Sequence, residues 1–346
     1  MKKFLIIVSF FMLLNNVHSI SASSYIVYDM DSNRVLQSNN KDNQRLIASI
    51  SKIMTAIIAI ENGTLEDTIT ADKTILKGVG SSIYIEVGES LTLKDLLYGM
   101  MLRSGNDAAI MIANYISGSE EKFTKLMNDY AKKIGMNNTK FYNASGLENS
   151  DGLGNLSSAY DMAKLTSYAF KNKTFRKIFK TKFYETKSDK KSYSWYTKNK
   201  LLKYDYITGG KTGYTQKAKR TLVTTGYVNN TNIVIVTLND SNDWNDHLTL
   251  YKSIKDNYKK VTLLTKNKSI PNNIFLDNKI YIKNNYSLLL KNTDEVDINY
   301  VLRNKSNNNV IGKVNIYVNN QIVYTTDIYI SKAKKTLFDK IKEKLL

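Results

Sequence analysis

Ser49 and Lys52 stand three positions apart at the head of an apolar run that ends at Ile60. Such a run predicts a buried helix, and positions i and i+3 of a helix are neighbours on one face, so the Lys52 amine can reach the Ser49 hydroxyl. A serine hydroxyl is a weak nucleophile until a base takes its proton. A lysine can be that base if burial or a nearby positive charge lowers its pKa. Alone, the pair is also typical of a solvated helix start, so the interpretation depends on partners elsewhere in the chain.

The scarcity of other reactive side chains strengthens the case for lysine as the base. The chain has no cysteine, which excludes thiol nucleophiles, disulfides and cysteine metal sites. It has two histidines, so a histidine-rich zinc site cannot be assembled. His18 falls in a segment that we expect to be removed, and a Ser-His-Asp triad could therefore use only His247. No metal and no other cofactor are expected.

Two further motifs are candidate partners of the Ser49–Lys52 pair. The first is Ser104-Gly105-Asn106, which follows a predicted helix, and the second is Lys211-Thr212-Gly213-Tyr214, which precedes a predicted hairpin. Glycine beside Lys and Thr on a strand lets a peptide backbone approach closely and pair along the strand edge. Lys211 could attract a substrate carboxylate, and its charge could help keep Lys52 neutral. Each motif alone is also compatible with an ordinary exposed turn.

The elements that must position these motifs point to an α/β (α+β) domain. Alternation and turn residues predict strands at 25–30 and 34–37 and a hairpin of strands 221–227 and 233–238. Helices are predicted at the Ser49 stretch, at 93–101, from the Asn106 motif to 115, and at 122–134, 157–170 and 247–258. Helices between a first and a last set of strands indicate one antiparallel sheet. After residue 261, short strands alternate with Asn-rich turns, which predicts a small all-β domain.

The first residues of the chain have the pattern of a segment that is removed on export, and the last residues have the pattern of a membrane-associated helix. Residues 1–23 read as a signal peptide: two lysines, an apolar centre of eleven residues, and small residues that favour cleavage after Ser21 or Ser23. The centre is shorter than the roughly 20 residues that span a bilayer. Residues 331–346 form an amphipathic pattern rich in lysine, which predicts a helix lying on an anionic membrane surface. The alternative is a helix packed on its own domain.

The net charge of +19 also favours anionic partners. Residues 1–23 contribute two lysines and no acid, so +17 remains after their removal. For an exported chain, acidic lipid and anionic wall polymer are the expected partners. The basic residues are spread along the chain, so no nucleic-acid partner is expected.

Together the three motifs resemble the set Ser-x-x-Lys, Ser-x-Asn and Lys-Thr-Gly of penicillin-binding proteins and serine β-lactamases. The chain resembles the low-molecular-mass penicillin-binding proteins that act as D-alanyl-D-alanine carboxypeptidases, peptidase family S11. The stretches 45–49, 102–109, 140–147 and 211–215 carry the match, which extends over the whole mature chain, including the trailing β domain and the tail. Relatives often have Pro at Ile47, Thr at Ser51, and Asp-Gly with one further residue at 208–210.

The resemblance implies a penicillin-binding-protein/β-lactamase-like transpeptidase fold and a catalytic role for three residues. Ser49 would attack the carbonyl between the last two D-alanines of a peptidoglycan stem peptide and form an acyl-enzyme. Lys52 would accept the Ser49 proton. Ser104 would carry a proton to the leaving D-alanine. β-Lactams, which imitate the D-Ala-D-Ala end, would acylate Ser49 and remain attached.

The substrate-binding residues follow from the same resemblance. Asn106 would orient the substrate amide, and Lys211 and Thr212, followed by Gly213, would hold the terminal carboxylate. The backbone N–H groups of Ser49 and Tyr214 would form the oxyanion hole. The implied organisation is a signal peptide at 1–23, a serine DD-peptidase domain at 24–261, an all-β domain at 262–330 and a membrane-association helix at 331–346. The expected location is the outer face of the bacterial cytoplasmic membrane or the cell wall.

Four competing interpretations remain open from the sequence. A serine β-lactamase is the nearest rival, although the Ser-Gly-Asn triplet, the β domain and the tail favour the carboxypeptidase. A DD-endopeptidase would share every catalytic residue. A catalytically inactive wall-binding relative would keep the fold, but Ser49 and Lys52 are both present. A polyanion-binding protein would explain the charge and leave the three motifs unexplained.

Overall fold

A five-stranded antiparallel sheet joins the beginning and the end of the first 260 residues. The computed structural model describes residues 19–149, 151–270, 278–307 and 309–332. Within them the sheet has the order β2-β1-β11-β10-β9, so β1 from the start of the chain pairs with β11, which comes much later. All its pairings are antiparallel. The strands are β1 (Ser24–Asp29), β2 (Arg34–Asn39), β9 (Ile207–Thr215), β10 (Lys219–Val228) and β11 (Thr231–Asp240).

The hairpin of β10 and β11 sets the register of the sheet. Its two turn residues, Asn229 and Asn230, have positive φ values of 50° and 59°, as a tight hairpin turn of this kind requires. Val228 pairs with Thr231 directly across the turn. Val223 on β10 is buried on one face of the sheet and Leu222 on the other, because neighbouring side chains of a strand alternate.

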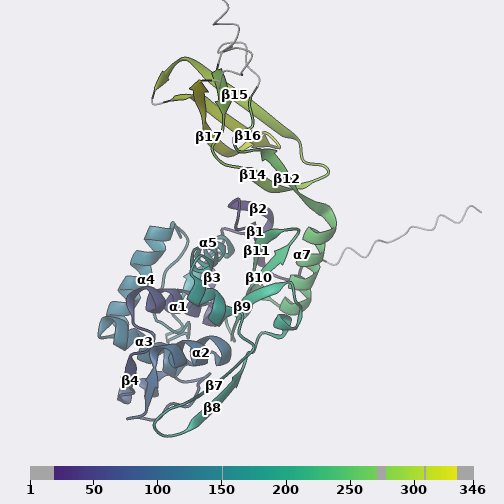
Figure 1. Cartoon of the computed structure of the whole chain (residues 1–346). Helices are drawn as coiled ribbons and strands as arrows, with labels where there is room; N and C mark the ends of the chain where they lie inside the picture. Colours follow the sequence, from purple (N-terminus) through teal and green to yellow (C-terminus); the bar gives the residue numbers. More distant parts are fainter. Residues whose placement is uncertain (1–18, 150, 271–277, 308, 333–346) are drawn as a thin grey trace, which may run out of the picture.

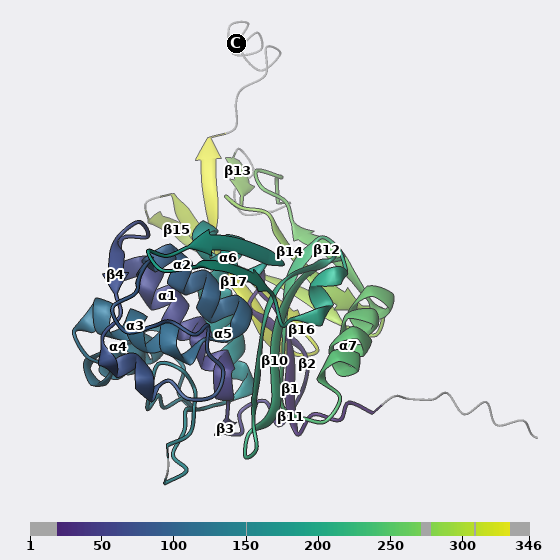
Figure 2. The same ribbon diagram turned by 90° about the horizontal axis from the view of Figure 1, so that it is seen from below.

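Helices cover both faces of this sheet (Figures 1 and 2). One core contains Val223 together with residues of the helices α1 to α6, and a second core lies between the other face and α7. The two cores make a three-layer arrangement in which the sheet is buried on both faces. The helices are α1 (Lys52–Asn62), α2 (Leu93–Arg103), α3 (Asn106–Ser117), α4 (Glu120–Ile134), α5 (Ala159–Phe170), α6 (Lys173–Phe179) and α7 (Asp243–Asn257).

The predicted mixed α/β fold with an antiparallel sheet is therefore confirmed. The structure differs from the prediction in the start of one helix and in several elements that were not predicted. α7 begins at Asp243, four residues earlier than predicted. The helix α6 and the hairpin of β7 (Phe183–Lys187) and β8 (Ser192–Tyr196) were not predicted. The remaining short elements are β3 (Arg45–Leu46), β4 (Thr68–Thr70), β5 (Ser90–Thr92), β6 (Leu156–Ser157) and three 3₁₀ turns, η1 (Ala48–Ser51), η2 (Lys73–Lys77) and η3 (Lys200–Lys203).

The residues after α7 form antiparallel strands with a third apolar core of their own, above the sheet in Figure 1. β12 pairs with β14, and the other four strands follow the order β13-β17-β16-β15. β12 runs through position 261, where a domain boundary was predicted, so the chain crosses that point as continuous strand. The strands are β12 (Tyr258–Leu264), β13 (Asn278–Tyr281), β14 (Tyr286–Lys291), β15 (Val296–Asn307), β16 (Val310–Val318) and β17 (Gln321–Lys332).

The predicted membrane helix and most of the predicted signal peptide lie outside the described residues. Ser331 and Lys332 belong to β17, so the helix prediction is wrong for these two positions. Residues 333–346 and 1–18 are not described. No helix within the described ranges is long and apolar enough to cross a bilayer.

Candidate active site

The Ser49–Lys52 pair sits where a 3₁₀ turn runs into the buried helix α1. Ser49 belongs to η1, and Lys52 is the first residue of α1. In a 3₁₀ turn the side chains at i and i+3 nearly eclipse, so the two groups face each other. The Lys52 Nζ lies 3.1 Å from the Ser49 Oγ. The predicted contact is present, although the pair spans a 3₁₀ turn and not a regular α-helix.

The Lys52 amine is surrounded by three oxygen atoms. Besides Ser49, it donates to Asn106 Oδ1 at 2.7 Å and to the backbone carbonyl of Ser145 at 2.5 Å. A neutral amine has two N–H bonds and one lone pair. If the N–H bonds point at Asn106 and Ser145, the lone pair is left directed at the Ser49 hydroxyl. This geometry suits an amine that accepts the serine proton.

The surroundings of Lys52 also favour the neutral form. Its side chain is fully buried, and burial lowers the pKa of Lys52 from 10.5 to about 7. The charge of Lys198 acts in the same direction, and that of Asp107 opposes it. A large fraction of the molecules therefore carries a neutral Lys52 at neutral pH. The sequence had indicated Lys211 as the positive charge that helps to keep Lys52 neutral. In the structure the charge that lowers the pKa of Lys52 is that of Lys198.

The second and third motifs meet on the other side of Ser49. Ser104 ends α2 with a φ of 68°, and Asn106 begins α3 two residues later. Lys211 Nζ donates to Ser104 Oγ at 3.0 Å and to the carbonyl of Thr212 at 2.8 Å. Lys211 is buried, and burial followed by the charges of Lys52 and Lys198 lowers its pKa well below 10.5. A hydrogen-bonded chain thus links the edge strand β9 to the α2–α3 turn.

Gly213 lets β9 pass directly beside Ser49. A Cβ atom at this position would lie 2.9 Å from the Ser49 backbone nitrogen and 2.4 Å from Thr221 Oγ1. The close approach brings the backbone at Gly213 and Tyr214 next to the Ser49 N–H. An oxyanion hole needs two backbone donors close together, and the pairing of the Ser49 and Tyr214 N–H groups in this role stays a prediction.

The loop at 143–147 closes the site from a third side. Asn143 Oδ1 accepts hydrogen bonds from the N–H groups of Ser145 and Gly146, at 3.2 and 2.7 Å. Thr55 on α1 donates to the Ala144 carbonyl at 2.6 Å. These bonds aim the Ser145 carbonyl at Lys52. The stretch 140–147 supported the family resemblance. The role of the Ser145 carbonyl was missed, because every residue has a backbone carbonyl and no residue type marks one as an acceptor.

Asp107 holds a second loop against the site. Its carboxylate accepts hydrogen bonds from the N–H groups of Ile83 and Ile85 at 3.1 Å, and also from the Ser82 hydroxyl. The Asn106 side chain donates to the Val79 carbonyl at 2.6 Å in the same loop. Asn106 and Asp107 therefore connect the α2–α3 turn to residues 79–85. Asp107 follows the Ser104-Gly105-Asn106 motif and lies in the matching stretch 102–109, but its role was not predicted.

All eight predicted site residues lie in this region or beside it. His247, by contrast, is buried beneath the sheet, where its ring contacts Thr224 and Thr237. Burial lowers the pKa of His247 to about 3, so the ring is neutral and structural. It is not placed to form a triad with Ser49. Among the described residues, no group of acidic or histidine side chains is arranged to hold a metal ion.

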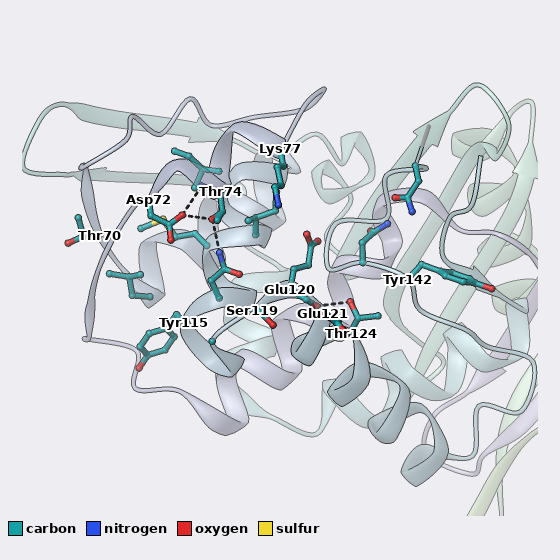
Figure 3. Close-up of a pocket in the computed structure, with 18 residues that line it drawn as sticks. Thr70, Asp72, Thr74, Lys77, Tyr115, Ser119, Glu120, Glu121, Thr124 and Tyr142 are labelled. Carbon is teal, nitrogen blue, oxygen red and sulfur yellow. Dashed lines mark hydrogen bonds between the residues drawn. The ribbon is translucent and has the colours of Figure 1, made fainter. Parts of the chain in front are cut away.

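A groove of about 790 Å³, lined by none of the eight predicted site residues, borders the 143–147 loop (Figure 3). It is lined by η2, α3 and the start of α4, and Asn143 forms part of its wall. Asp72, Glu120 and Glu121 face it together with Lys77. Glu120 accepts a hydrogen bond from the Ala144 N–H at 3.2 Å, so the groove wall supports the loop that carries Ser145.

Comparisons with known proteins identify the family to which the chain belongs. The family model Peptidase_S11, described as D-alanyl-D-alanine carboxypeptidase, matches residues 13–242, more than half of the chain. The chain belongs to this family.

Individual relatives show how far the similarity extends. The D-alanyl-D-alanine carboxypeptidase DacF of Bacillus subtilis is 36% identical over 223 residues, which cover 62% of this chain and 56% of that protein. The chain thus spans about half the length of this relative. A D-alanyl-D-alanine endopeptidase of Haemophilus influenzae is 30% identical over 236 residues, covering 64% of this chain and 76% of that protein.

Solved structures show the same fold. The structure of penicillin binding protein 5 from Haemophilus influenzae superimposes with a TM-score of 0.75 and covers 91% of this chain and 97% of its own. Its sequence is 22% identical, so it supports the fold alone. The overlap includes the residues after α7 as well as the helical and sheet layers.

Proposed function

We propose that this protein is a serine-type D-alanyl-D-alanine carboxypeptidase that removes the terminal D-alanine from peptidoglycan stem peptides. The observation that carries the proposal is the position of the Lys52 amine between Ser49 Oγ, Asn106 Oδ1 and the Ser145 carbonyl. An amine held in this way and buried has the geometry and the pKa of a general base for the serine. Family membership supports the choice of substrate.

The acylation step uses the atoms described above. Lys52 takes the proton as Ser49 Oγ attacks the carbonyl carbon, and the N–H groups of Ser49 and Tyr214 stabilise the oxyanion. Ser49 also lies just ahead of α1, where the helix dipole favours negative charge. When the intermediate collapses, the proton passes by way of Ser104 to the departing amine. Water then hydrolyses the ester and frees the enzyme.

The edge of β9 binds the substrate in this proposal. β9 is the outermost strand of the sheet, so an extended peptide can pair along it. Asn106 orients the substrate amide, and Lys211 with Thr212 receives the terminal carboxylate. The Lys211 Nζ lies 3.0 Å from Ser104 Oγ, which supports a carboxylate site beside the proposed proton path. β-Lactams enter the same place and acylate Ser49.

A DD-endopeptidase activity is the second candidate, because one relative is named for it. The same acyl-enzyme chemistry would cut a cross-link if the site admits an amine larger than D-alanine. The exposed side chains of Tyr214 and Val79 beside the site leave its rim open. A serine β-lactamase or an inactive wall-binding protein would share this fold, and the response to penicillin distinguishes both from the carboxypeptidase.

We further propose that the protein works outside the cytoplasmic membrane. Residues 1–23 act as the export signal, 24–261 as the catalytic unit, 262–330 as an all-β unit that holds it off the surface, and 331–346 as a membrane-association helix. The support is the leader pattern and the lysine-rich amphipathic tail in the sequence. The net charge of +19 favours the anionic lipid surface.

Intact mass after exposure to benzylpenicillin tests the proposal. We expect one covalent adduct on the folded protein and none on Ser49→Ala, followed by D-alanine release from a stem pentapeptide by the unmodified enzyme only. Ser51→Ala is the matched control, because Ser51 is buried and donates to the Ala48 carbonyl. Fast penicillin turnover without an adduct would indicate a β-lactamase. No reaction by a folded sample would indicate the inactive relative.

A further inference from the structure

Three buried carboxylates gather where β11 ends and α7 begins. Asp240, Asp243 and Asp246 have exposed fractions of 2%, 3% and 3%. They lie away from the Ser49 site, and neither the family motifs nor the proposed mechanism uses them. Burying a carboxylate is costly unless a cation or several donors compensate for it.

The segment at the predicted cleavage region supplies most of the donors. Ser21 N donates to Asp246 Oδ2 at 2.6 Å, and Ser21 Oγ lies 2.7 Å from Asp240 Oδ1 and 2.9 Å from Asp246 Oδ2. The next residue, Ala22, is 4% exposed, and its N–H donates to the same Asp246 oxygen at 3.3 Å. These donors are neutral as long as the chain is uncut.

The negative charge of the cluster is only partly balanced. The cation closest to it is Arg220, 3.6 Å from Asp243, and the Arg220 side chain is half exposed. Asp240 Oδ2 is buried and has no hydrogen-bond partner among the described residues. Burial raises the pKa of both Asp240 and Asp243, and at Asp243 the charge of Arg220 offsets this only in part. A group with positive charge and several N–H bonds would complete the site.

We propose that cleavage after Ser21 supplies this group, and that the acidic cluster binds the new α-ammonium of Ala22. In this step a signal-cleaving endopeptidase adds water across the Ser21–Ala22 peptide bond: the hydroxyl goes to the Ser21 carbonyl, and the Ala22 nitrogen takes up protons to become an ammonium. The Ala22 nitrogen already lies 3.3 Å from Asp246. The inference rests on the proposed export, since only a processed chain has this amine.

Of the two predicted cleavage positions, the contacts favour Ser21 over Ser23. Ser23 N donates to the Asn239 carbonyl at 3.1 Å, and Ser23 Oγ and carbonyl accept from Asn239 and Asn40 at 2.8 and 3.0 Å. A cut after Ser23 would remove all three bonds together with buried Ala22. A cut after Ser21 replaces neutral donors with a charged one, and the Asn242 N–H continues to bind Asp240 at 2.9 Å.

The first test is the N-terminus of the exported protein. The full chain is expressed with its leader in a bacterial host, recovered from the cell envelope, and analysed by intact mass and N-terminal sequencing. We expect Ala22 as the first residue. A chain that begins at Ile20 or Ser24, or that keeps its leader, overturns the inference. Penicillin adduct formation on the same sample reports the proposed activity separately, so the two can fail independently.

The second test asks whether the ammonium is bound by the cluster. An amine-reactive acetylating reagent at neutral pH should label the Ala22 amine about tenfold more slowly in the folded protein than in guanidinium, because each unit of pKa increase lowers the free amine tenfold. Asp246→Asn should abolish the protection. Asp256→Asn is the matched control, since Asp256 lies on the same helix, half exposed and paired with Lys252. Equal labelling of the folded and unfolded chain would refute the binding, even if the Asn variant does not fold.

Discussion

Three lysine side chains share the space around the nucleophile, and their charges act on one another. Lys52 and Lys211 are buried, while Lys198 lies exposed beside them, where its amine donates to Ser81 Oγ at 3.1 Å. Burial is the main cause that lowers the pKa of Lys52, and the charge of Lys198 is the next. Lys198 therefore acts as a positioning residue through charge, without contacting the reacting atoms.

Lys198→Gln should move the pH dependence of Ser49 acylation. In the proposed mechanism neutral Lys52 is the base, so the acylation rate should rise with pH through about 7, the pKa of Lys52. Removing a neighbouring positive charge makes protonation of Lys52 easier, raises its pKa, and shifts this rise to higher pH by up to about one unit. The measurement is the second-order rate constant of penicillin acylation between pH 5 and 9.

Lys200→Gln provides the control for this shift. Lys200 is also exposed and lies two residues away, in η3, but it does not contribute to the low pKa of Lys52. We expect its profile to match that of the unmodified enzyme. A profile that is flat across the range, or that moves to lower pH in Lys198→Gln, would show that Lys52 is not the titrating base.

At the level of elements, the site depends on two turns with positive φ that meet, and one of them is strained. Ala48 has a φ of 48°, unusual for a residue with a side chain, and it directly precedes the nucleophile. Gly146 has a φ of 83°, and a Cβ at this position would lie 2.0 Å from the Ala48 carbonyl oxygen. The loop that directs Ser145 at Lys52 can therefore reach η1 only with glycine at 146. Backbone strain of this kind is common at functional sites.

Gly146→Ala should reduce the acylation of Ser49 much more strongly than backbone strain alone would. The suitable control is Gly118→Ala, because Gly118 has a similar φ of 78° and no atom within 4 Å of the added Cβ. In the control we expect about 1–2 kcal/mol lower stability and normal acylation. In Gly146→Ala the clash must displace the loop or η1, and penicillin acylation should fall by orders of magnitude. Thermal melts and acylation rates measured side by side separate the two effects.

The sequence predicted those parts of the site that are local or that match a motif. The Ser49–Lys52 contact follows from spacing alone, and the buried α1 follows from its apolar run. The meeting of Ser104 with Lys211, across 107 positions, came from the resemblance and not from any local pattern. Lys198 and Lys200 lie in the same short stretch of sequence. Only the folded structure shows that Lys198, and not Lys200, affects the pKa of Lys52. The Ser145 carbonyl is a backbone atom, so residue types do not mark it.

The fold was predicted unevenly for similar reasons. The hairpin of β10 and β11 has strong alternation and an Asn-Asn turn, which are local signals. In β8, Tyr193 and Trp195 are buried between exposed neighbours. The alternation of apolar and polar residues that predicts a strand was therefore present in the sequence, but no strand was predicted there. The boundary placed at 261 falls within β12 because this strand joins the two parts as one element. A change in amino-acid composition shows roughly where one type of domain gives way to another. It does not show where an individual strand ends.

For the whole molecule, a largely buried ion pair connects the five-stranded sheet to the strands after α7. Arg34 on β2 donates to the Leu289 carbonyl at 2.6 Å and to Asp294 at 3.1 Å. Their side chains are 17% and 7% exposed. Burial opposes ionisation of Asp294, but hydrogen bonds from the Lys291 N–H, Asn319 and Arg34 outweigh it and lower its pKa. The bridge therefore contributes stability above the unfolded pKa of Asp294 and loses it as pH falls through the lower folded value.

Arg34→Ala should loosen the strands after α7 without changing Ser49 chemistry. Leaving a largely buried Asp294 without its cation costs about 3 kcal/mol. We expect a lower melting temperature or a separate early transition at neutral pH, with an unchanged penicillin acylation rate. Lys94→Ala is the control, because its pair with Glu66 is 3.9 Å long and exposed, and such pairs contribute at most about 1 kcal/mol. Equal destabilisation by both changes would contradict a structural role for Arg34.

The position of β9 at the margin of the sheet has a consequence for solubility as well as for binding. An unpaired strand edge is a template on which other extended chains assemble, and proteins protect themselves by keeping such edges short. In β9, residues 209–211 and 213 are buried, Thr208, Thr212 and Thr215 are half-buried, and only Tyr214 is exposed. The accessible edge is thus only a few residues long. It is long enough for the last two residues of a peptide and too short to seed the stacking of one molecule on another.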